Sequence, residues 1–86
     1  MKYTILIERY AQKLIMKLNK EDIPLIKGAI ASLANDPRPP GSKKLKGESA
    51  WRIRMRNYRI IYEIDDDRVI VTVITVGHRK NVYRKN

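Results

Sequence analysis

The chain has 86 residues, no cysteine, and 19 lysines and arginines against 9 acidic residues, a formal net charge of +10 at pH 7. This length suits one small domain, and a content of 43% hydrophobic residues favours a folded chain. The absence of cysteine excludes disulfides and thiolate metal sites, and no apolar run approaches the ~20 residues of a membrane span. The excess of positive charge indicates an anionic partner, with a merely solubilising surface as the alternative.

The first part of the chain predicts one strand and two helices. Residues 2–8 are apolar on both faces, which is typical of a covered strand. Residues 9–18 carry apolar side chains at helical spacing, and a second helical repeat covers residues 23–33. Asp22 is placed to cap this second helix, with Pro24 in its first turn. We expect the two helices to pack as an antiparallel hairpin.

A proline-rich segment, residues 35–42, cannot continue a helix and predicts a loop. Three lysines follow this loop: Lys43, Lys44 and Lys46. Lysines in loops are usually solvated, but these three also precede a strongly basic stretch. They are therefore candidates to lie beside a basic face.

Residues 51–64, with the sequence WRIRMRNYRIIYEI, alternate along two predicted strands. A two-residue turn at 56–57 sets Arg54 opposite Arg59, with the apolar side chains toward a core. The other face of the sheet then carries Arg52, Arg54, Arg59 and Glu63. Like charges directly opposite each other destabilise a sheet, so we expect an anionic ligand at this face. Because Arg-Asn is not a favoured hairpin turn, a register shifted by one residue or a wider loop stays open.

The last part of the chain predicts a turn, a central strand and a tail. Residues 65–68, DDDR, form a polar turn; a metal site is the alternative, although a turn tip lacks spaced partner ligands. Residues 69–76, VIVTVITV, are β-branched and apolar on both faces, as in a central strand. Gly77 ends this strand, and residues 78–83 leave the sheet edge. The predicted fold class is α+β, in the order β-α-α-β-β-β: an antiparallel sheet with a helical hairpin packed on one face.

The candidate chemistry lies where the arginines of this sheet meet the tail, which contributes His78, Arg79 and Tyr83. Arginine matches phosphate oxygens bidentately, and tyrosine stacks on unpaired bases. His78 is the one side chain here that titrates near neutrality. Such a set would bind single-stranded RNA and stabilise a phosphorane-like transition state without a metal or cofactor. A plain basic binding face, with Tyr83 as a packing residue, is the alternative.

Residues 51–84, WRIRMRNYRIIYEIDDDRVIVTVITVGHRKNVYR, resemble the C-terminal part of RelE-type toxins of toxin–antitoxin systems, and the preceding elements follow the same order. The resemblance implies a single RelE-like toxin domain over residues 1–86. It implies a cytoplasmic mRNA endoribonuclease that enters the ribosomal A site and cuts mRNA by metal-independent attack of the RNA 2′-OH, inhibiting translation. It also implies neutralisation by an acidic cognate antitoxin in a heteromeric complex, with no membrane partner.

The resemblance also assigns catalytic residues. The family's pair of basic residues on the second strand corresponds to Arg52 and Arg54, and the arginine after the aromatic residue of the third strand corresponds to Arg59. The family's arginine after the final strand corresponds to Arg79, and its C-terminal tyrosine corresponds to Tyr83. Residues expected to bind RNA more generally are Lys43, Lys44, Lys46 and Arg56.

The proton acceptor of the expected reaction stays open. Some relatives have lysines where this chain has Arg52 and Arg54, and a pKa above ~12 makes arginine a poor general base. His78 and Glu63 are therefore candidates to share that work. Two other functions also stay open: inhibition of DNA gyrase, as by ParE-type toxins of the same superfamily, and a non-catalytic RNA- or ribosome-binding module.

Overall fold

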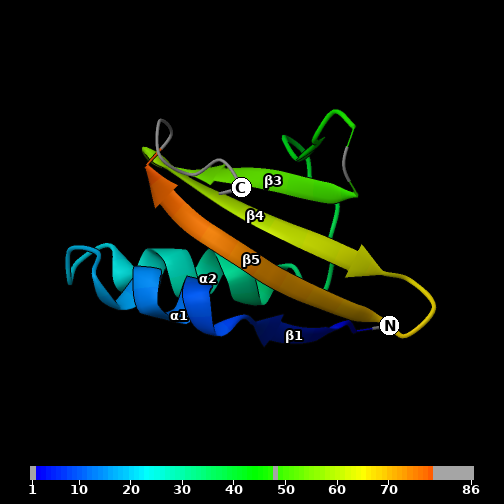
Figure 1. Cartoon of the computed structure of the whole chain (residues 1–86), viewed down its shortest axis with the longest axis horizontal. Helices are drawn as coiled ribbons and strands as arrows, with labels where there is room; N and C mark the ends of the chain where they lie inside the picture. The colour runs from blue at the N-terminus through cyan, green and yellow to red at the C-terminus, as the bar shows by residue number, and fades with distance from the viewer. Residues whose placement is uncertain (1, 48, 79–86) are drawn as a thin grey trace.

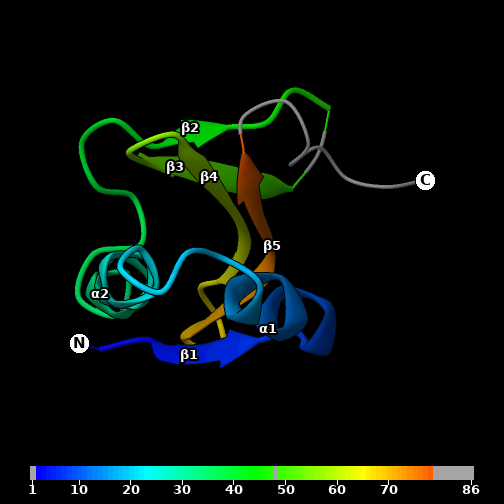
Figure 2. The ribbon, with the colours of Figure 1, turned by 90° about the vertical axis from the view of Figure 1, so that its left-hand side faces the viewer.

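The computed structural model describes residues 2–47 and 49–78. Its elements are β1 (Thr4–Ile7), α1 (Arg9–Met16), α2 (Ile23–Ser32), β2 (Lys43–Lys44), β3 (Ala50–Met55), β4 (Tyr58–Asp65) and β5 (Ile70–His78). The two helices lie side by side on one face of the sheet (Figure 1). Seen along the helices, the sheet curls around them from β1 to β2 (Figure 2). This arrangement confirms the predicted α+β fold with a helical hairpin on one face.

The five strands follow the order β1-β5-β4-β3-β2. Strands β3, β4 and β5 pair antiparallel, as predicted, but β1 pairs parallel with β5, so the sheet is mixed. Periodicity shows which faces of a strand are apolar but not which distant strand becomes its neighbour or in which direction. The sheet also gains β2, a two-residue strand paired with β3 where we expected only loop. A strand of this length is too short to produce a periodic signal.

The core lies between the helices and the sheet. It consists of Ala11, Ile15, Ile26, Ile30, Leu33, Ile53, Tyr58, Ile60, Tyr62, Val71, Val73 and Val76. A second, smaller apolar cluster forms on the opposite face of the sheet from Ala50 and Ile61, with Leu45 and Ile74 packed against them. These two clusters explain why β5 is apolar on both of its faces.

An irregularity in the pairing of β4 with β5 sets which side chains share a face at the end of the sheet. Ile61 pairs with Thr75 and Tyr62 pairs with Val73, so Ile74 is an extra residue in β5. A bulge of this kind reverses the alternation of all residues that follow it. Beyond Ile74, Tyr58 therefore pairs with His78.

The start of α2 differs from the prediction. Asp22 stands at the N-cap, and Pro24 lies in the first turn, but the Asp22 side chain makes no capping hydrogen bond. Its backbone already has helical angles (φ −88°, ψ −22°), whereas a capping side chain usually needs an extended residue. The Asp22 carboxylate instead accepts a hydrogen bond of 2.7 Å from the Tyr58 hydroxyl. The predicted capping role is therefore wrong.

The proline-rich loop is fixed to the sheet by polar contacts. The Tyr62 hydroxyl donates to the Pro37 carbonyl at 2.7 Å, and Arg38 lies over the Trp51 ring at 5.2 Å. Arg38 Nη2 also pairs with Asp66 Oδ2 at 2.8 Å, while the Tyr3 hydroxyl donates to Asp66 Oδ1 at 2.7 Å. The acidic turn thus serves as an anchor for this loop.

In the described part of the chain, no helix is long and apolar enough to cross a membrane.

Candidate nucleic-acid interface

The hairpin of β3 and β4 has the register that the sequence predicts. Arg54 pairs with Arg59, and Met55 pairs with Tyr58 across the two-residue turn. Arg56 has a φ of 56°, in the left-handed region that primed two-residue hairpin turns require at their first central residue. The predicted opposition of two arginines is therefore present.

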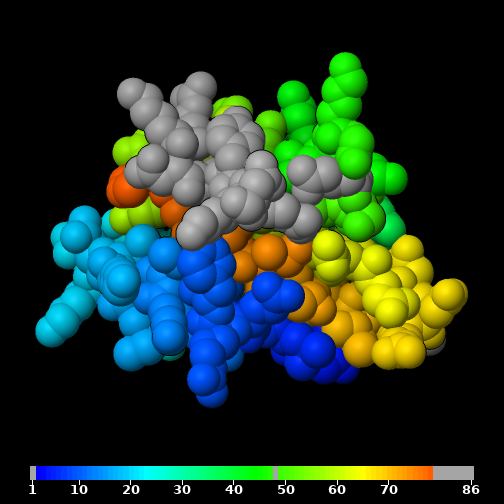
Figure 3. Space-filling view, in the orientation of Figure 1, coloured from blue at the N-terminus to red at the C-terminus, as the bar shows by residue number. Residues whose placement is uncertain are grey.

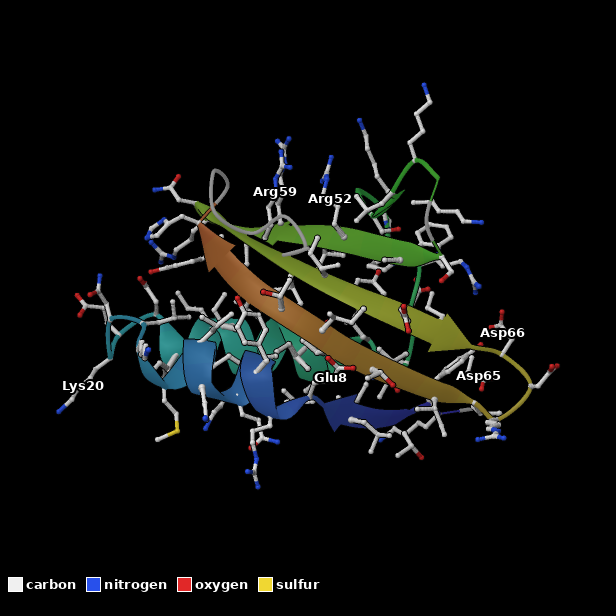
Figure 4. The ribbon with its side chains drawn as sticks, viewed as in Figure 1. Glu8, Lys20, Arg52, Arg59, Asp65 and Asp66 are labelled. Carbon is white, nitrogen blue, oxygen red and sulfur yellow. The ribbon has the colours of Figure 1, made fainter. Side chains whose placement is uncertain are left out.

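Basic side chains gather on the face of the sheet that points away from the helices. We call Lys43, Arg52, Arg54 and Arg59 the arginine face. Figure 4 shows Arg52 and Arg59 rising in the same direction from their strands. Lys43 joins them because β2 pairs it directly with Arg52, and directly paired residues point to the same side. β2 therefore extends the face by one basic residue.

The members of the arginine face differ in burial. Arg52 and Arg59 are only 8% and 9% exposed, whereas Arg54 and Lys43 are exposed. Charges removed from water are less screened and act more strongly on a nearby phosphate than exposed ones do. Because both buried arginines also lie inside strands, their positions are set by the sheet rather than by a loop. The face therefore combines two buried charges with two exposed ones.

A groove runs along the edge of β3 and borders the arginine face. Its volume is about 460 Å³, and it is lined by Ala29, Ser32, Pro39, Pro40, Gly41, Lys43, Arg52, Ile53, Arg54 and Met55. The groove is open because β2 pairs only with Trp51 and Arg52 and leaves the rest of β3 uncovered. It offers apolar walls beside cationic groups, a combination that suits the base and phosphate of a nucleotide.

The other residues expected to bind RNA lie around this region. Lys44 pairs with Trp51, so it points to the opposite side from Lys43, while Lys46 is exposed in the loop that follows. In the space-filling view, the green segment that contains residues 43–47 protrudes from the upper edge of the molecule (Figure 3). Arg56 is exposed in the hairpin turn. These residues form a basic margin rather than part of the arginine face.

His78 lies on the helix side of the sheet. It pairs with Tyr58, a core residue, and the centroids of the two rings are 4.8 Å apart with an interplanar angle of 33°. Arg59 pairs with Gly77 and points to the other side. We expected His78 to lie with the arginines, but the structure places it on the other side of the sheet. Arg79 and Tyr83 lie outside the described residues.

The sequence did not predict the contact between Asp22 and Tyr58 near this site. The contact between them joins positions 36 residues apart. The available signal was weak, because a carboxylate at the start of a helix predicts a cap before it predicts a distant partner.

β4 carries two further titratable residues near the arginine face, Tyr58 and Glu63. The hydrogen bond to Asp22 raises the pKa of Tyr58 above its usual range, which keeps the hydroxyl protonated. Glu63 is half-buried on the outer side of β4. Among the described residues, no group of three or more His, Cys, Asp or Glu side chains could hold a metal ion.

Comparison with known proteins identifies the family. Residues 5–83 match the family described as ParE toxins of type II toxin–antitoxin systems, parDE. Toxin RelG of Mycobacterium tuberculosis is 31% identical over 88 residues, which cover 99% of this chain and all of RelG.

Solved structures agree with this match. A chain of the M. tuberculosis toxin–antitoxin complex RelBE2 superimposes with a TM-score of 0.79 at 27% identity, covering 92% of this chain and 100% of that one. A chain of the intact E. coli RelBE toxin–antitoxin complex gives a TM-score of 0.77 at 29% identity, covering 88% and 95%. The chain therefore belongs to the ParE toxin family and is a type II toxin of the RelE/ParE superfamily.

Proposed function

We propose that this toxin is a cytoplasmic endoribonuclease that cuts mRNA in the ribosomal A site and so inhibits translation. The observation that carries the proposal is the arginine face, where Arg52 and Arg59 are buried on adjacent strands beside exposed cations. A toxin that only needed solubility would place its charges on mobile, exposed positions. Two fixed guanidinium groups are instead suited to a phosphate whose charge grows during a reaction.

The proposed step is attack of the RNA 2′-oxygen on the adjacent phosphorus, without a metal ion. The new P–O2′ bond forms as the P–O5′ bond breaks, leaving a 2′,3′-cyclic phosphate and a 5′-hydroxyl. The 2′-OH proton is lost, and the departing 5′-oxygen gains one. In this step Arg52 and Arg59 stabilise the phosphorane, while Arg54 and Lys43 hold neighbouring phosphates.

We infer that the rate enhancement comes mainly from charge. Arginine does not accept a proton at neutral pH, and His78 lies on the opposite side of the sheet. Glu63 is on the outer side, but it is four residues from Arg59 along β4, roughly 13 Å away in an extended strand. We assign Arg79 a further charge at the phosphate and Tyr83 a stacking role on a base, by their resemblance to the family.

The proposed partners are mRNA, ribosomal RNA of the A site and a cognate acidic antitoxin. The related M. tuberculosis and E. coli chains were solved as toxin–antitoxin complexes. A net charge of +10 attracts an acidic segment. An apolar groove of about 890 Å³, lined in part by Leu6, Ile15, Met16 and Ile30, offers a surface for the segment's apolar side chains.

Gyrase inhibition is the second candidate function, favoured by the match to ParE toxins. The two functions differ in their targets, so parallel assays separate them. Supercoiling by purified gyrase would be inhibited by a ParE-like toxin and unaffected by a ribonuclease.

The test of the proposed function is a map of mRNA 5′ ends during induced expression. We expect new ends inside coding regions within minutes of induction, with none after expression of the Arg59→Ala protein. Intact mRNA together with inhibited supercoiling would replace the proposal with gyrase inhibition. Intact mRNA with retained ribosome binding would instead favour a non-catalytic module.

A further inference from the structure

A polar contact ties the end of the sheet to the helical hairpin, directly behind the arginine face. Tyr58, the first residue of β4, is 4% exposed, and its hydroxyl donates to Asp22 Oδ2 at 2.7 Å. The ring of His78, at the end of β5, lies against the same tyrosine, with 4.8 Å between the ring centroids and a tilt of 33° between the ring planes. Asp22, Tyr58 and His78 thus connect α2, β4 and β5.

The contact is not explained by the needs of α2. Asp22 stands at the N-cap but makes no capping hydrogen bond, although a side chain of this type there normally does. Its carboxylate is directed to Tyr58 instead. The hydrogen bond therefore serves the link between the helices and the sheet.

The position of this link matters because Tyr58 and Arg59 are consecutive. Tyr58 pairs with His78 and Arg59 with Gly77, so the two neighbouring pairs point to opposite sides of the sheet. The β3–β4 turn and the end of β5 both lie here, and strand ends usually fray unless something holds them. Movement of the Tyr58 pair would therefore move the backbone of Arg59.

We propose that Tyr58 is a positioning residue: its hydrogen bond to Asp22 and its contact with the His78 ring hold the end of β4 so that Arg59 stays directed at the RNA phosphate. This inference rests on the proposed ribonuclease function. It predicts that loss of one hydroxyl on the helix side lowers the rate of chemistry on the other side. Displacement of a catalytic group by about 1 Å can reduce a rate by up to ~10²-fold.

The chain offers a matched control. Tyr62 lies in the same strand, on the same side and fully buried, and its hydroxyl also makes a 2.7 Å hydrogen bond, to the Pro37 carbonyl. Tyr58→Phe and Tyr62→Phe each remove one oxygen and one hydrogen bond. Only the first residue adjoins Arg59. A difference between the two variants therefore reports position rather than loss of stability.

The experiment compares single-turnover mRNA cleavage on ribosomes by wild type and these variants at a temperature where all are folded. We expect Tyr58→Phe to lower the maximal rate about tenfold with half-saturation unchanged, and Tyr62→Phe to stay within about twofold of wild type. Asp22→Ala should lower the maximal rate as much as Tyr58→Phe does, and combining the two changes should lower it no further. Asp22→Asn should recover most of the rate, because its amide oxygen still accepts the hydrogen bond. Equal rates for Tyr58→Phe and Tyr62→Phe would overturn the inference.

A second measurement does not depend on activity. The Arg59 Nε atom is buried, so its N–H signal should be observable by NMR. We expect Tyr58→Phe to broaden or shift this signal, and Tyr62→Phe to leave it unchanged. If wild type cleaves no RNA but the signal responds in this way, the proposed function fails and the positioning role stands. If wild type cleaves and the signal is unchanged in Tyr58→Phe, the positioning role fails alone.

Discussion

Replacement of Arg59 and of Arg54 by alanine should have very different effects on cleavage, although the two residues face each other. Two unit charges about 4 Å apart interact by about 1 kcal/mol in bulk water and about 4 kcal/mol at the effective dielectric constant of ~20 near a protein surface. Arg54 is exposed and corresponds to the first case, whereas Arg59 is 9% exposed and approaches the second. These energies correspond to a decrease in the cleavage rate of about fivefold for Arg54→Ala and of about 10²- to 10³-fold for Arg59→Ala.

The assay is single-turnover cleavage of a defined mRNA on ribosomes, at two salt concentrations. Arg68→Ala is the control for net charge, because Arg68 is 80% exposed in the turn after β4, away from the arginine face. We expect this control to keep its rate, and we expect higher salt to weaken the effect of Arg54→Ala more than that of Arg59→Ala. Equal losses of rate for Arg54→Ala and Arg59→Ala, or a loss as large for Arg68→Ala, would show that burial does not determine the contribution of each charge.

Four further predictions concern the stability of the protein and its dependence on pH. Tyr62→Phe leaves the buried Pro37 carbonyl without its donor and should lower the free energy of unfolding by about 1–3 kcal/mol, measured by urea denaturation at pH 7. Burial raises the pKa of Tyr62 to about 12, so wild type should lose stability as the pH rises from ~10 toward this value, and the loss should be smaller in the phenylalanine variant. The hydrogen bond from Arg38 lowers the pKa of Asp66, so the stabilisation from this ion pair is present above pH ~4 and is lost as the pH falls through the lowered value. Asp66→Asn should therefore flatten the decrease of thermal stability at acidic pH. An unchanged decrease would argue against a stabilising Arg38–Asp66 pair. His78→Gln should reduce cleavage without removing a limb from the pH–rate profile; loss of a limb in this variant would make His78 the general base.

The sequence was most informative where short-range patterns decide the structure. Alternation over residues 51–64 and a two-residue turn were enough to predict that Arg54 faces Arg59, since both features act between neighbours in the chain. The helical hairpin followed from periodicity in the same way. The three arginines of this face were therefore predictable from the side chains of one hairpin, whereas Lys43 joins the face through β2.

Long-range features were not predictable by these means. The parallel pairing of β1 with β5 joins the two ends of the fold, and no local pattern encodes it. Alternation counted from Val71 would place His78 with the arginines, but the extra residue Ile74 reverses the phase. A bulge leaves no mark in a strand that is apolar on both faces. Likewise, the choice of Asp22 between a cap and Tyr58 depends on tertiary contact.

The most direct test of the proposed mechanism is to identify the nucleophile of the reaction. Ribosomes are programmed with an mRNA that carries a single 2′-deoxynucleotide immediately before the mapped cleavage position, beside the all-ribose mRNA, and the products are analysed for their end groups. We expect cleavage of the all-ribose mRNA to a 2′,3′-cyclic phosphate and a 5′-hydroxyl, and no cleavage at the deoxy position. Undiminished cleavage at that position, with a 5′-phosphate on the product, would contradict attack by the 2′-oxygen.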